Sequence, residues 1–397
     1  MNTKYCTINP LLNVLYLYQY GLLIPILIRS ESKIPIVIFT VLLVFICILT
    51  NGIKLSKPVF LLIYIPLLLI LFKTLYSPVL IGEDNTGEIL LSFLSIGISG
   101  ILIGSISYNF ERFLYYGTII GWINFLFLFS VPFAGISEIN YMRFGYAMLP
   151  TFCFTIYAFL IGKNKIINIL IALFSGIEIL LFGARGSFLA ICIFFVIIFF
   201  FINKKHTFRG IIILFTIITI LLLFYDSILY WVQELISSRG YFSYSLIKAL
   251  RLVDGTGDIE SVSSGRFSIY RKALDNIAEN PILGSPLNNA IETANTPYYH
   301  NIVLDIVVSF GIIVFVCFFL LISISFIRMI KAHDTQLRWI YCILFVLSFG
   351  RLTVSSVFWQ RPEFWLFISF FISNWKFFLQ KNSVNIRPPT LSAQSKI

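Results

Sequence analysis

The chain consists of long apolar runs separated by short polar breaks. The runs approach the roughly 20 residues that a helix needs to cross about 30 Å of hydrocarbon, and their continuous apolar character excludes an outer-membrane barrel. Helices then remain as the way to satisfy the backbone inside a membrane, so the pattern predicts an all-α integral membrane protein with about twelve transmembrane helices. The predicted spans are residues 11–28, 34–53, 58–80, 89–108, 113–133, 144–162, 166–183, 187–203, 210–230, 299–326, 339–358 and 363–379.

These spans divide the chain into four parts. Residues 1–230 hold predicted helices one to nine, 231–298 form a large loop, 299–380 hold the last three helices, and 381–397 form a tail. Loops of this length without a role are uncommon, although a plain connection between two spans is the alternative.

The large loop itself contains patterns typical of amphipathic helices. One stretch is compatible with a helix as far as Arg251, and a second helix is predicted up to Glu279, where Asn280-Pro281 ends it. We expect this second helix to use Ser263 or Ser264 as its N-cap. Its predicted apolar stripe consists of Phe267, Tyr270, Leu274 and Ile277.

Composition agrees with a membrane protein, since 58% of the residues are hydrophobic and 12% are charged. The formal net charge of +11 results from 29 lysine and arginine residues against 18 acidic ones, and the positions of the basic residues explain this excess. With a cytoplasmic N-terminus, 16 of the 29 lie in predicted cytoplasmic segments and 7 in the short loops opposite, as the positive-inside rule requires. The charge therefore predicts both termini in the cytoplasm and no nucleic-acid partner.

The candidate chemistry is concentrated at the non-cytoplasmic ends of the spans. Arg185 lies between two apolar runs, Arg266 lies in the large loop, and His300 lies at the mouth of the tenth span. Guanidinium groups stay charged and donate paired hydrogen bonds to phosphate oxygens, and histidine is a suitable general base near neutral pH. These residues predict a site for a lipid-linked diphosphate and a sugar hydroxyl, and we expect no metal and no cofactor.

Each of these residues also has a structural interpretation. Arg185 is compatible with a turn residue that binds helix C-terminal carbonyls. Arg266 could pair with Asp258 or Glu260 on the protein surface. His300 could cap the tenth helix, so the position of each side chain has to decide between the two interpretations.

Two segments resemble the O-antigen ligase and O-antigen polymerase superfamily. The run from Gly183 to Leu189 is similar to that superfamily's Arg-x-x-x-Leu segment. The second segment begins with Gly265-Arg266 and passes through Gly284. It ends in His300-Asn301-x-x-Leu304 with Gly311 beyond, as in the large-loop signature, although Gly284-Ser285-Pro286 lacks the second glycine of the family pattern.

The resemblance implies a GT-C-like fold and a metal-independent, inverting glycosyl transfer on the periplasmic face of the bacterial inner membrane. Its implied donor is an undecaprenyl-diphosphate-linked glycan, held at its diphosphate by Arg185 and Arg266, while His300 activates the acceptor hydroxyl. Membrane lipids are expected partners, and the resemblance leaves room for a chain-length regulator protein.

Further polar and aromatic residues on the same face extend this candidate site. They are predicted to line the glycan or phosphate path: Arg143, Arg351, Arg361, Tyr299 and Asn301. Tyr298, Tyr299, Trp359 and Trp365 could stack on sugars, but interfacial aromatic residues also form the ordinary membrane belt.

Three functions stay open at this point. An O-antigen polymerase is favoured by His300-Asn301 and by the turn from Gln360 to Trp365, while an O-antigen ligase, which acts on the lipid A core, is the alternative. A polysaccharide transporter or flippase is the third, and it is disfavoured because its ionisable residues would lie near the bilayer midplane on repeat-related helices.

Overall fold

The computed structural model describes most of the chain. The described residues are 8–30, 34–52, 56–76, 86–106, 109–129, 131, 141–182, 185–202, 225–238, 244–254, 265–287, 289–296, 298–354 and 356–375.

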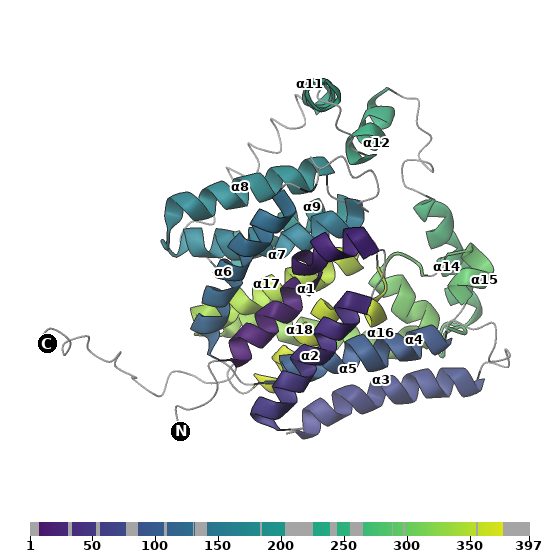
Figure 1. The fold of residues 1–397 in the computed structure, drawn as a ribbon. Helices are drawn as coiled ribbons and strands as arrows, with labels where there is room; N and C mark the ends of the chain where they lie inside the picture. The colour runs from purple at the N-terminus through teal and green to yellow at the C-terminus, as the bar shows by residue number, and fades with distance from the viewer. Residues whose placement is uncertain are drawn as a thin grey trace, which may run out of the picture.

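The regular elements in these ranges are helices (Figure 1). The first half contains α1 (Asn9–Ser30), α2 (Ile34–Asn51), α3 (Lys57–Tyr76), α4 (Thr86–Ser92), a π-helical turn (Phe93–Gly97), α5 (Ile98–Gly104), α6 (Phe110–Phe129), α7 (Tyr141–Leu160), α8 (Lys165–Phe182), α9 (Arg185–Ile197) and a second π-helical turn (Ile198–Ile202). The second half contains α11 (Tyr225–Ser237), α12 (Tyr244–Val253), α14 (Arg266–Glu279), α15 (Asn289–Ala294), α16 (Ile302–Lys331), α17 (Thr335–Leu352), a 3-10 turn (Phe358–Gln360) and α18 (Pro362–Ser373).

The prediction of an all-helical membrane protein is confirmed. Every predicted span overlaps a described helix, although residues 210–224 of the span 210–230 lie outside the described residues. Among the described residues, six helices are long and apolar enough to cross a membrane: Ile34–Asn51, Lys57–Leu75, Gly87–Gly104, Phe110–Phe129, Lys165–Phe182 and Ile302–Lys331. The number of twelve crossings, the side of the membrane on which the large loop lies and the four-part division stay predictions.

Helices in the centre of the bundle carry polar side chains that bond to neighbouring helices. The Tyr16 hydroxyl of α1 lies 2.8 Å from Ser99 Oγ of α5, and the Asn124 amide of α6 donates to Thr151 of α7 at 2.9 Å. Outer helices such as α2 and α3 instead expose large apolar side chains. Inside a membrane this division is expected. Polar side chains in the centre can bind neighbouring helices, whereas polar side chains that face lipid would find no hydrogen-bond partner.

Close packing between α5 and α18 brings the end of the chain against its first half. A side chain at Gly100 would collide with Trp365, and one at Gly104 would collide with Leu366 and Ser369. The absence of a side chain at Gly100 and Gly104 therefore allows the two helices to pack closely. As a result, the turn before α18 lies beside α4, where Gln360 Nε2 donates to Glu88 Oε1 at 3.3 Å.

The segment that follows α14 is inserted into a break in α16. Gly311 interrupts the helix with φ 79°, and Gly284 of the inserted segment has φ 72°. The Ile312 amide donates to the Pro281 carbonyl at 2.9 Å, and Val308 accepts from the Ser285 amide at 2.6 Å. These bonds replace part of the interrupted ladder, as non-helical backbone at membrane depth requires.

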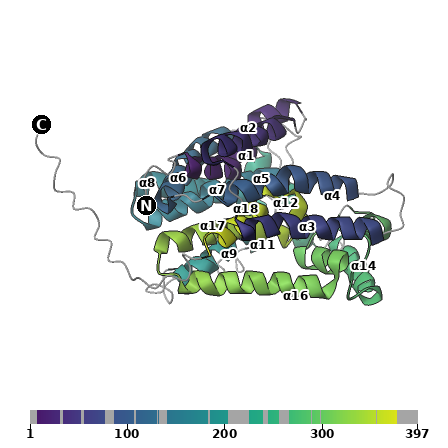
Figure 2. The ribbon, with the colours of Figure 1, turned by 90° about the horizontal axis from the view of Figure 1, so that it is seen from below.

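A lysine from α3 fixes the same segment from the other side. Lys73 is buried, and its Nζ donates to the Leu283 carbonyl at 2.6 Å and to the Ser285 carbonyl at 3.1 Å. In Figures 1 and 2, α14 therefore lies beside the ends of α3 and α16, close to the residues that begin α16. This part of the predicted loop is thus held against the helix bundle by hydrogen bonds to its backbone carbonyls.

The buried face of α14 differs from the predicted one. Helix α14 ends at Glu279 as expected, but its N-cap is Gly265, and the Ser263 and Ser264 positions lie outside the described residues. Phe267 and Leu274 are 59% and 60% exposed. The buried residues of α14 are Ile269, Ala273 and Asn276.

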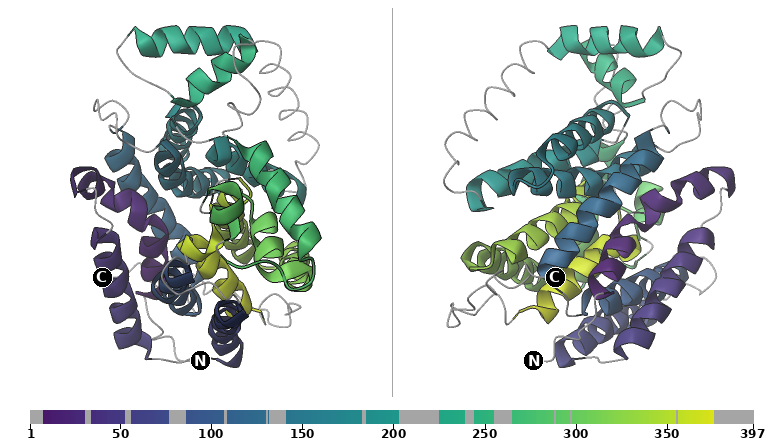
Figure 3. Two further views of the ribbon diagram at one scale, coloured as in Figure 1. Left: turned by 90° about the vertical axis from the view of Figure 1, so that its right-hand side faces the viewer. Right: turned by 60° about the vertical axis from the view of Figure 1, so that its left-hand side comes forward.

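Asn276 is buried because its amide binds the Tyr299 hydroxyl at 2.8 Å. With Asn276 inside, the buried face of α14 differs from the face that its predicted apolar residues would form. Helices α11 and α12 lie at the edge of the molecule, away from α16 (Figure 3).

Candidate functional site

The ends of several helices meet at one end of the bundle, which we call the arginine end. It contains the turn between α17 and α18, the starts of α4, α7, α9 and α16, and the α14 segment. The opposite end contains the Lys163–Glu111 pair at 3.9 Å and the Asn9–Asn51 amide pair at 2.8 Å. The candidate arginines that were predicted to lie on the non-cytoplasmic side of the membrane are therefore found at one end of the bundle, the arginine end.

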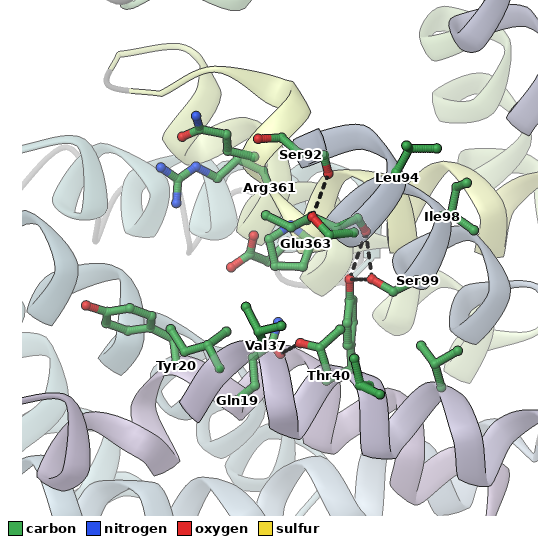
Figure 4. A pocket seen from close by; sticks show the side chains of 18 of the residues that line it. Gln19, Tyr20, Val37, Thr40, Ser92, Leu94, Ile98, Ser99, Arg361 and Glu363 are labelled. Carbon is green, nitrogen blue, oxygen red and sulfur yellow. Dashed lines mark hydrogen bonds between the residues drawn. The ribbon is translucent and has the colours of Figure 1, made fainter. Parts of the chain in front are cut away.

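A cavity with a volume of about 1020 Å³ lies at the arginine end (Figure 4). Its length is lined by apolar side chains from α2 and from the α4 to α5 stretch, among them Val37, Val41, Phe45, Leu94, Ile98 and Leu102. Its polar part contains Arg143, Arg351, Arg361, Glu88, Gln360 and Glu363. Figure 4 shows Arg361 and Glu363 on one side, and Gln19, Tyr20, Val37 and Thr40 on the other.

Arg351 and Arg361 are held in this cavity without a close carboxylate partner. The Arg351 guanidinium stacks 4.4 Å from the Tyr146 ring centre, and its buried Nε has no hydrogen-bond partner among the described residues. Arg361 donates through Nε to Ser356 Oγ. Within the described part of the chain, no carboxylate lies within 4 Å of either guanidinium.

The electrostatic surroundings of Arg361 favour an anion. Burial, followed by the positive charge of Arg351, lowers the pKa of Arg361 to about 9, against a smaller opposing effect of Glu363. The group is still a cation at neutral pH, but its charged form is destabilised where it lies. An anionic ligand between the two guanidinium groups would remove that penalty.

The backbone of Arg185 lies next to the same cluster. Arg185 begins α9, and its side chain lies outside what the structure describes. A side chain on the following residue, Gly186, would collide with the Tyr146 hydroxyl and with Val354. Since Tyr146 is also the ring beneath Arg351, α9 begins beside the cavity arginines.

His300 occupies a strained position between Tyr298 and the start of α16. Its φ of 57° is left-handed, which is uncommon for a residue other than glycine and is found at functional sites. The ring centre lies 4.3 Å from that of Tyr298, and the buried Nδ1 has no hydrogen-bond partner among the described residues. Burial, and then the positive charge of Arg266, lowers the pKa of His300 to about 4.

His300 is therefore a neutral imidazole at physiological pH and is available as a base. The N-cap of α16 is Asn301, whose side-chain oxygen accepts from Val303 N at 2.9 Å and Leu304 N at 3.4 Å. The alternative that His300 itself caps the helix is wrong.

Tyr298 connects the cavity arginines with the His300 region. Burial raises the pKa of Tyr298, and the nearby positive charges of Arg361, Arg351 and Arg266 oppose that effect. The arginines of both regions thus lie close enough to act on one hydroxyl. The proposed salt bridge of Arg266 with Asp258 or Glu260 involves partners outside the described residues.

Residues 170–319 match the model of a protein family described as O-antigen ligase. This match places residues 170–319 in the O-antigen ligase/polymerase superfamily. The superfamily consists of glycosyltransferase-like enzymes, polymerases or ligases, and the match together with the apolar helices makes this a multi-pass membrane protein. No curated protein and no solved structure gives a significant match to the chain.

The matched segment contains only part of the site. It runs from α8 into α16 and includes Arg185, Arg266 and His300. Arg143 and the two arginines next to α17 and α18 lie outside it, so the fold adds these cations to the matched residues.

Two predicted binding residues have structural partners. Besides Asn276, the Tyr299 hydroxyl binds Asn289 Oδ1 at 2.8 Å, and Asn301 forms the cap described above. Their roles in glycan binding stay predictions. Trp359 and Trp365 are buried among aromatic rings, with Trp365 5.0 Å from Phe93, so their assignment to an exposed membrane belt is wrong.

Asp305 is the residue of the site that sequence reasoning missed. It is buried one turn inside α16, its Oδ1 accepts from the Tyr299 amide at 2.8 Å, and its Oδ2 has no partner among the described residues. The signal was present, since an acidic residue in an apolar span is a functional candidate. Within the described ranges, no three His, Cys, Asp or Glu side chains come together as metal ligands would; metal independence of the reaction stays a prediction.

Proposed function

We propose that the protein is an O-antigen polymerase that joins undecaprenyl-diphosphate-linked oligosaccharide repeats at the periplasmic face of the bacterial inner membrane. In this reaction a hydroxyl of the acceptor repeat attacks the anomeric carbon of the donor glycan. The bond from that carbon to the diphosphate oxygen breaks with inversion, and undecaprenyl diphosphate leaves. Membrane lipids surround the enzyme, and a chain-length regulator protein fits the proposal as a partner.

The observation that carries this proposal is the placement of unpaired guanidinium groups in a cavity with apolar walls. A lipid-linked diphosphate has the matching structure, because its head is a multiple anion and its tail is hydrocarbon. Arg351 and Arg361 lack a carboxylate within 4 Å in the described part of the chain, and Val41, Phe45 and Leu102 are among the apolar lining residues. Arginines that bind the diphosphate would also stabilise the charge that grows on it as the bond breaks.

The acceptor hydroxyl has to lose a proton as it attacks, and His300 is the residue we assign to this step. Its low pKa keeps the imidazole neutral, so a ring nitrogen is free to accept the proton at neutral pH. Arg266 and Arg185 complete the proposed catalytic set. Arg266 acts electrostatically on His300, and the backbone of Arg185 begins α9 beside Tyr146, the ring beneath Arg351.

The experiment that tests the proposal uses purified protein in detergent with a defined undecaprenyl-diphosphate-linked repeat. We expect a ladder of longer lipid-linked glycans, because the reaction needs neither a metal nor a second compartment. If correctly folded protein extends none of a range of such repeats, the proposal is contradicted. A transporter would leave the glycans unchanged in this assay.

An O-antigen ligase is the second candidate, because the matched family model is described as O-antigen ligase and the match does not separate ligases from polymerases. The two activities share the donor and differ in the acceptor. Deleting the gene and examining the surface polysaccharide separates them. Single repeats on the lipid core indicate a polymerase, whereas a core without repeats together with accumulated long lipid-linked chains indicates a ligase.

A further inference from the structure

A second and smaller cavity adjoins the large one. Its volume is about 210 Å³, and it lies between α4, the segment after Pro286, the start of α16 and the turn before α18. Glu88, Ser92 and Gln360 line both cavities. The hydrogen bond from Gln360 to Glu88 therefore lies at the boundary between the two spaces.

The size and lining of this cavity suit a single sugar ring. Its volume corresponds to about seven water molecules at roughly 30 Å³ each. Tyr298 and Trp359 provide aromatic surface, and Asp305, Ser309 and Gln360 provide hydrogen-bonding groups. Sugar rings present apolar C–H faces together with hydroxyl groups that can donate to a carboxylate, so this combination fits them.

The absence of cations separates the small cavity from the diphosphate site. The described residues that line it include the carboxyl groups of Asp305 and Glu88 and no arginine or lysine, whereas the large cavity combines Glu88 and Glu363 with three arginines. Two carboxylates repel a diphosphate but accept hydrogen bonds from hydroxyl groups. The anionic head of a lipid-linked substrate thus belongs with the arginines of the large cavity, and a neutral sugar belongs here.

The position of the small cavity places its ligand beside the base. Tyr298 lines the cavity, and its ring lies 4.3 Å from that of His300. Asp305 belongs to the same helix start, and its Oδ2 has no partner among the described residues. A sugar in the cavity would satisfy this oxygen and would bring its hydroxyl groups toward the imidazole.

We propose that the small cavity is the acceptor-sugar subsite, in which Asp305 accepts a hydrogen bond from a hydroxyl of the acceptor's terminal sugar. This inference rests on the proposed glycosyl transfer and adds to it the site of the attacking glycan. Asp305 is a binding and specificity residue in this scheme. The proton of the attacking hydroxyl still goes to His300.

The test uses Asp305→Asn, because asparagine keeps the oxygen that accepts from the Tyr299 amide. The acceptor probe is an alkyl glycoside of the repeat unit, which lacks a diphosphate and so serves only as an acceptor. At saturating lipid-linked donor, we expect Asp305→Asn to raise the acceptor KM at least tenfold. The Kd for undecaprenyl diphosphate is expected to change less than twofold.

Two further variants separate ligand binding from folding. Ser309→Val adds apolar volume to the cavity and leaves Asp305 in place, so it is expected to raise the acceptor KM in the same way. Asp334→Asn is the matched control, since Asp334 caps α17 at the opposite end of the bundle through Gln336 N and Leu337 N. We expect its acceptor KM to equal that of the wild type.

The outcomes distinguish the subsite from the reaction. If the wild type extends the acceptor and both cavity variants match its acceptor KM, the subsite is wrong while the proposed function stands. A rise in donor KM instead of acceptor KM also overturns the subsite. Wild-type protein that extends no acceptor contradicts the proposed function, and the inference with it.

Discussion

Charged residues at the two ends of the helix bundle differ in their exposure to water and in their ion-pair partners. At the far end, Lys163 and Glu111 are 56% and 63% exposed and lie 3.9 Å apart, so water and an ion pair both stabilise them. At the arginine end, Arg351 and Arg361 are half-buried without a carboxylate within 4 Å in the described part of the chain. The first arrangement needs no ligand, whereas the second is stabilised when an anion binds.

The comparison also explains why the two ends differ in backbone geometry. The arginine end contains the break at Gly311, the inserted segment after Pro281 and the left-handed His300. Such conformations are unfavourable unless the surroundings hold them, and here Lys73 and α16 do so. The far end also contains left-handed residues, such as Asn164 with φ 40°, but this residue belongs to the short turn between α7 and α8, and α17 begins there with Asp334 as its cap. Strain and unpaired charge thus occur together where we place the chemistry.

Removing the proposed base gives the largest expected effect. His300→Ala is expected to lower kcat by about 100- to 10 000-fold, the range of general base catalysis, while the protein elutes as folded material. The measurement is the rate of chain extension at saturating substrates. A variant that keeps more than a tenth of the wild-type rate would show that another group takes the proton.

The pH dependence of kcat/KM is the next test. Since the pKa of His300 lies near 4, below its ordinary value of about 6.5, the free enzyme keeps its base unprotonated down to about pH 5. We expect a flat profile between pH 5 and 7.5, because kcat/KM reports the free enzyme. An acidic limb centred near 6.5 would mean that His300 is not buried beside Arg266.

The same shift predicts how stability changes with pH. The unfolded state gains a proton on His300 as the pH falls through about 6.5, whereas the folded state does so only near 4. This contribution to stability is therefore present above pH 6.5 and is lost as the pH falls toward 4.

The far end supplies the smallest expected effect. Lys163→Ala breaks an exposed ion pair, and such pairs contribute about 0–1 kcal/mol to stability. We expect chain extension and the Kd for undecaprenyl diphosphate to match the wild type. A loss of activity in this variant would remove the contrast between the two ends of the bundle.

Much of the fold was predictable because hydrophobic runs set the positions of membrane helices. The apolar pattern located α6, α8 and α16, and the large-loop sequence located α14 with its end at Glu279. It failed on the orientation of α14, since the buried polar contacts of Asn276 determine which face is inside. Hydrophobic periodicity does not contain that information.

The site was predictable as a set of cations but not as a geometry. Charge asymmetry placed Arg143, Arg351 and Arg361 at one end, and the structure brings them to one cavity. The ring of Tyr146 beneath Arg351 joins residues about 200 positions apart in the chain, and no local pattern signals such a contact. Asp305 carried a local signal, because it is an acidic residue within an apolar span.

The most direct test of the account is the affinity of the purified protein for undecaprenyl diphosphate compared with undecaprenyl monophosphate, in the wild type and in Arg361→Ala. We expect the wild type to prefer the diphosphate at least tenfold. Arg361→Ala is expected to weaken diphosphate binding by tenfold to a hundredfold, about 1.4–2.8 kcal/mol, with Lys163→Ala unchanged. Equal affinity for the two lipids, or an Arg361→Ala variant that binds the diphosphate as the wild type does, would contradict the claim that these unpaired arginines bind a lipid-linked diphosphate.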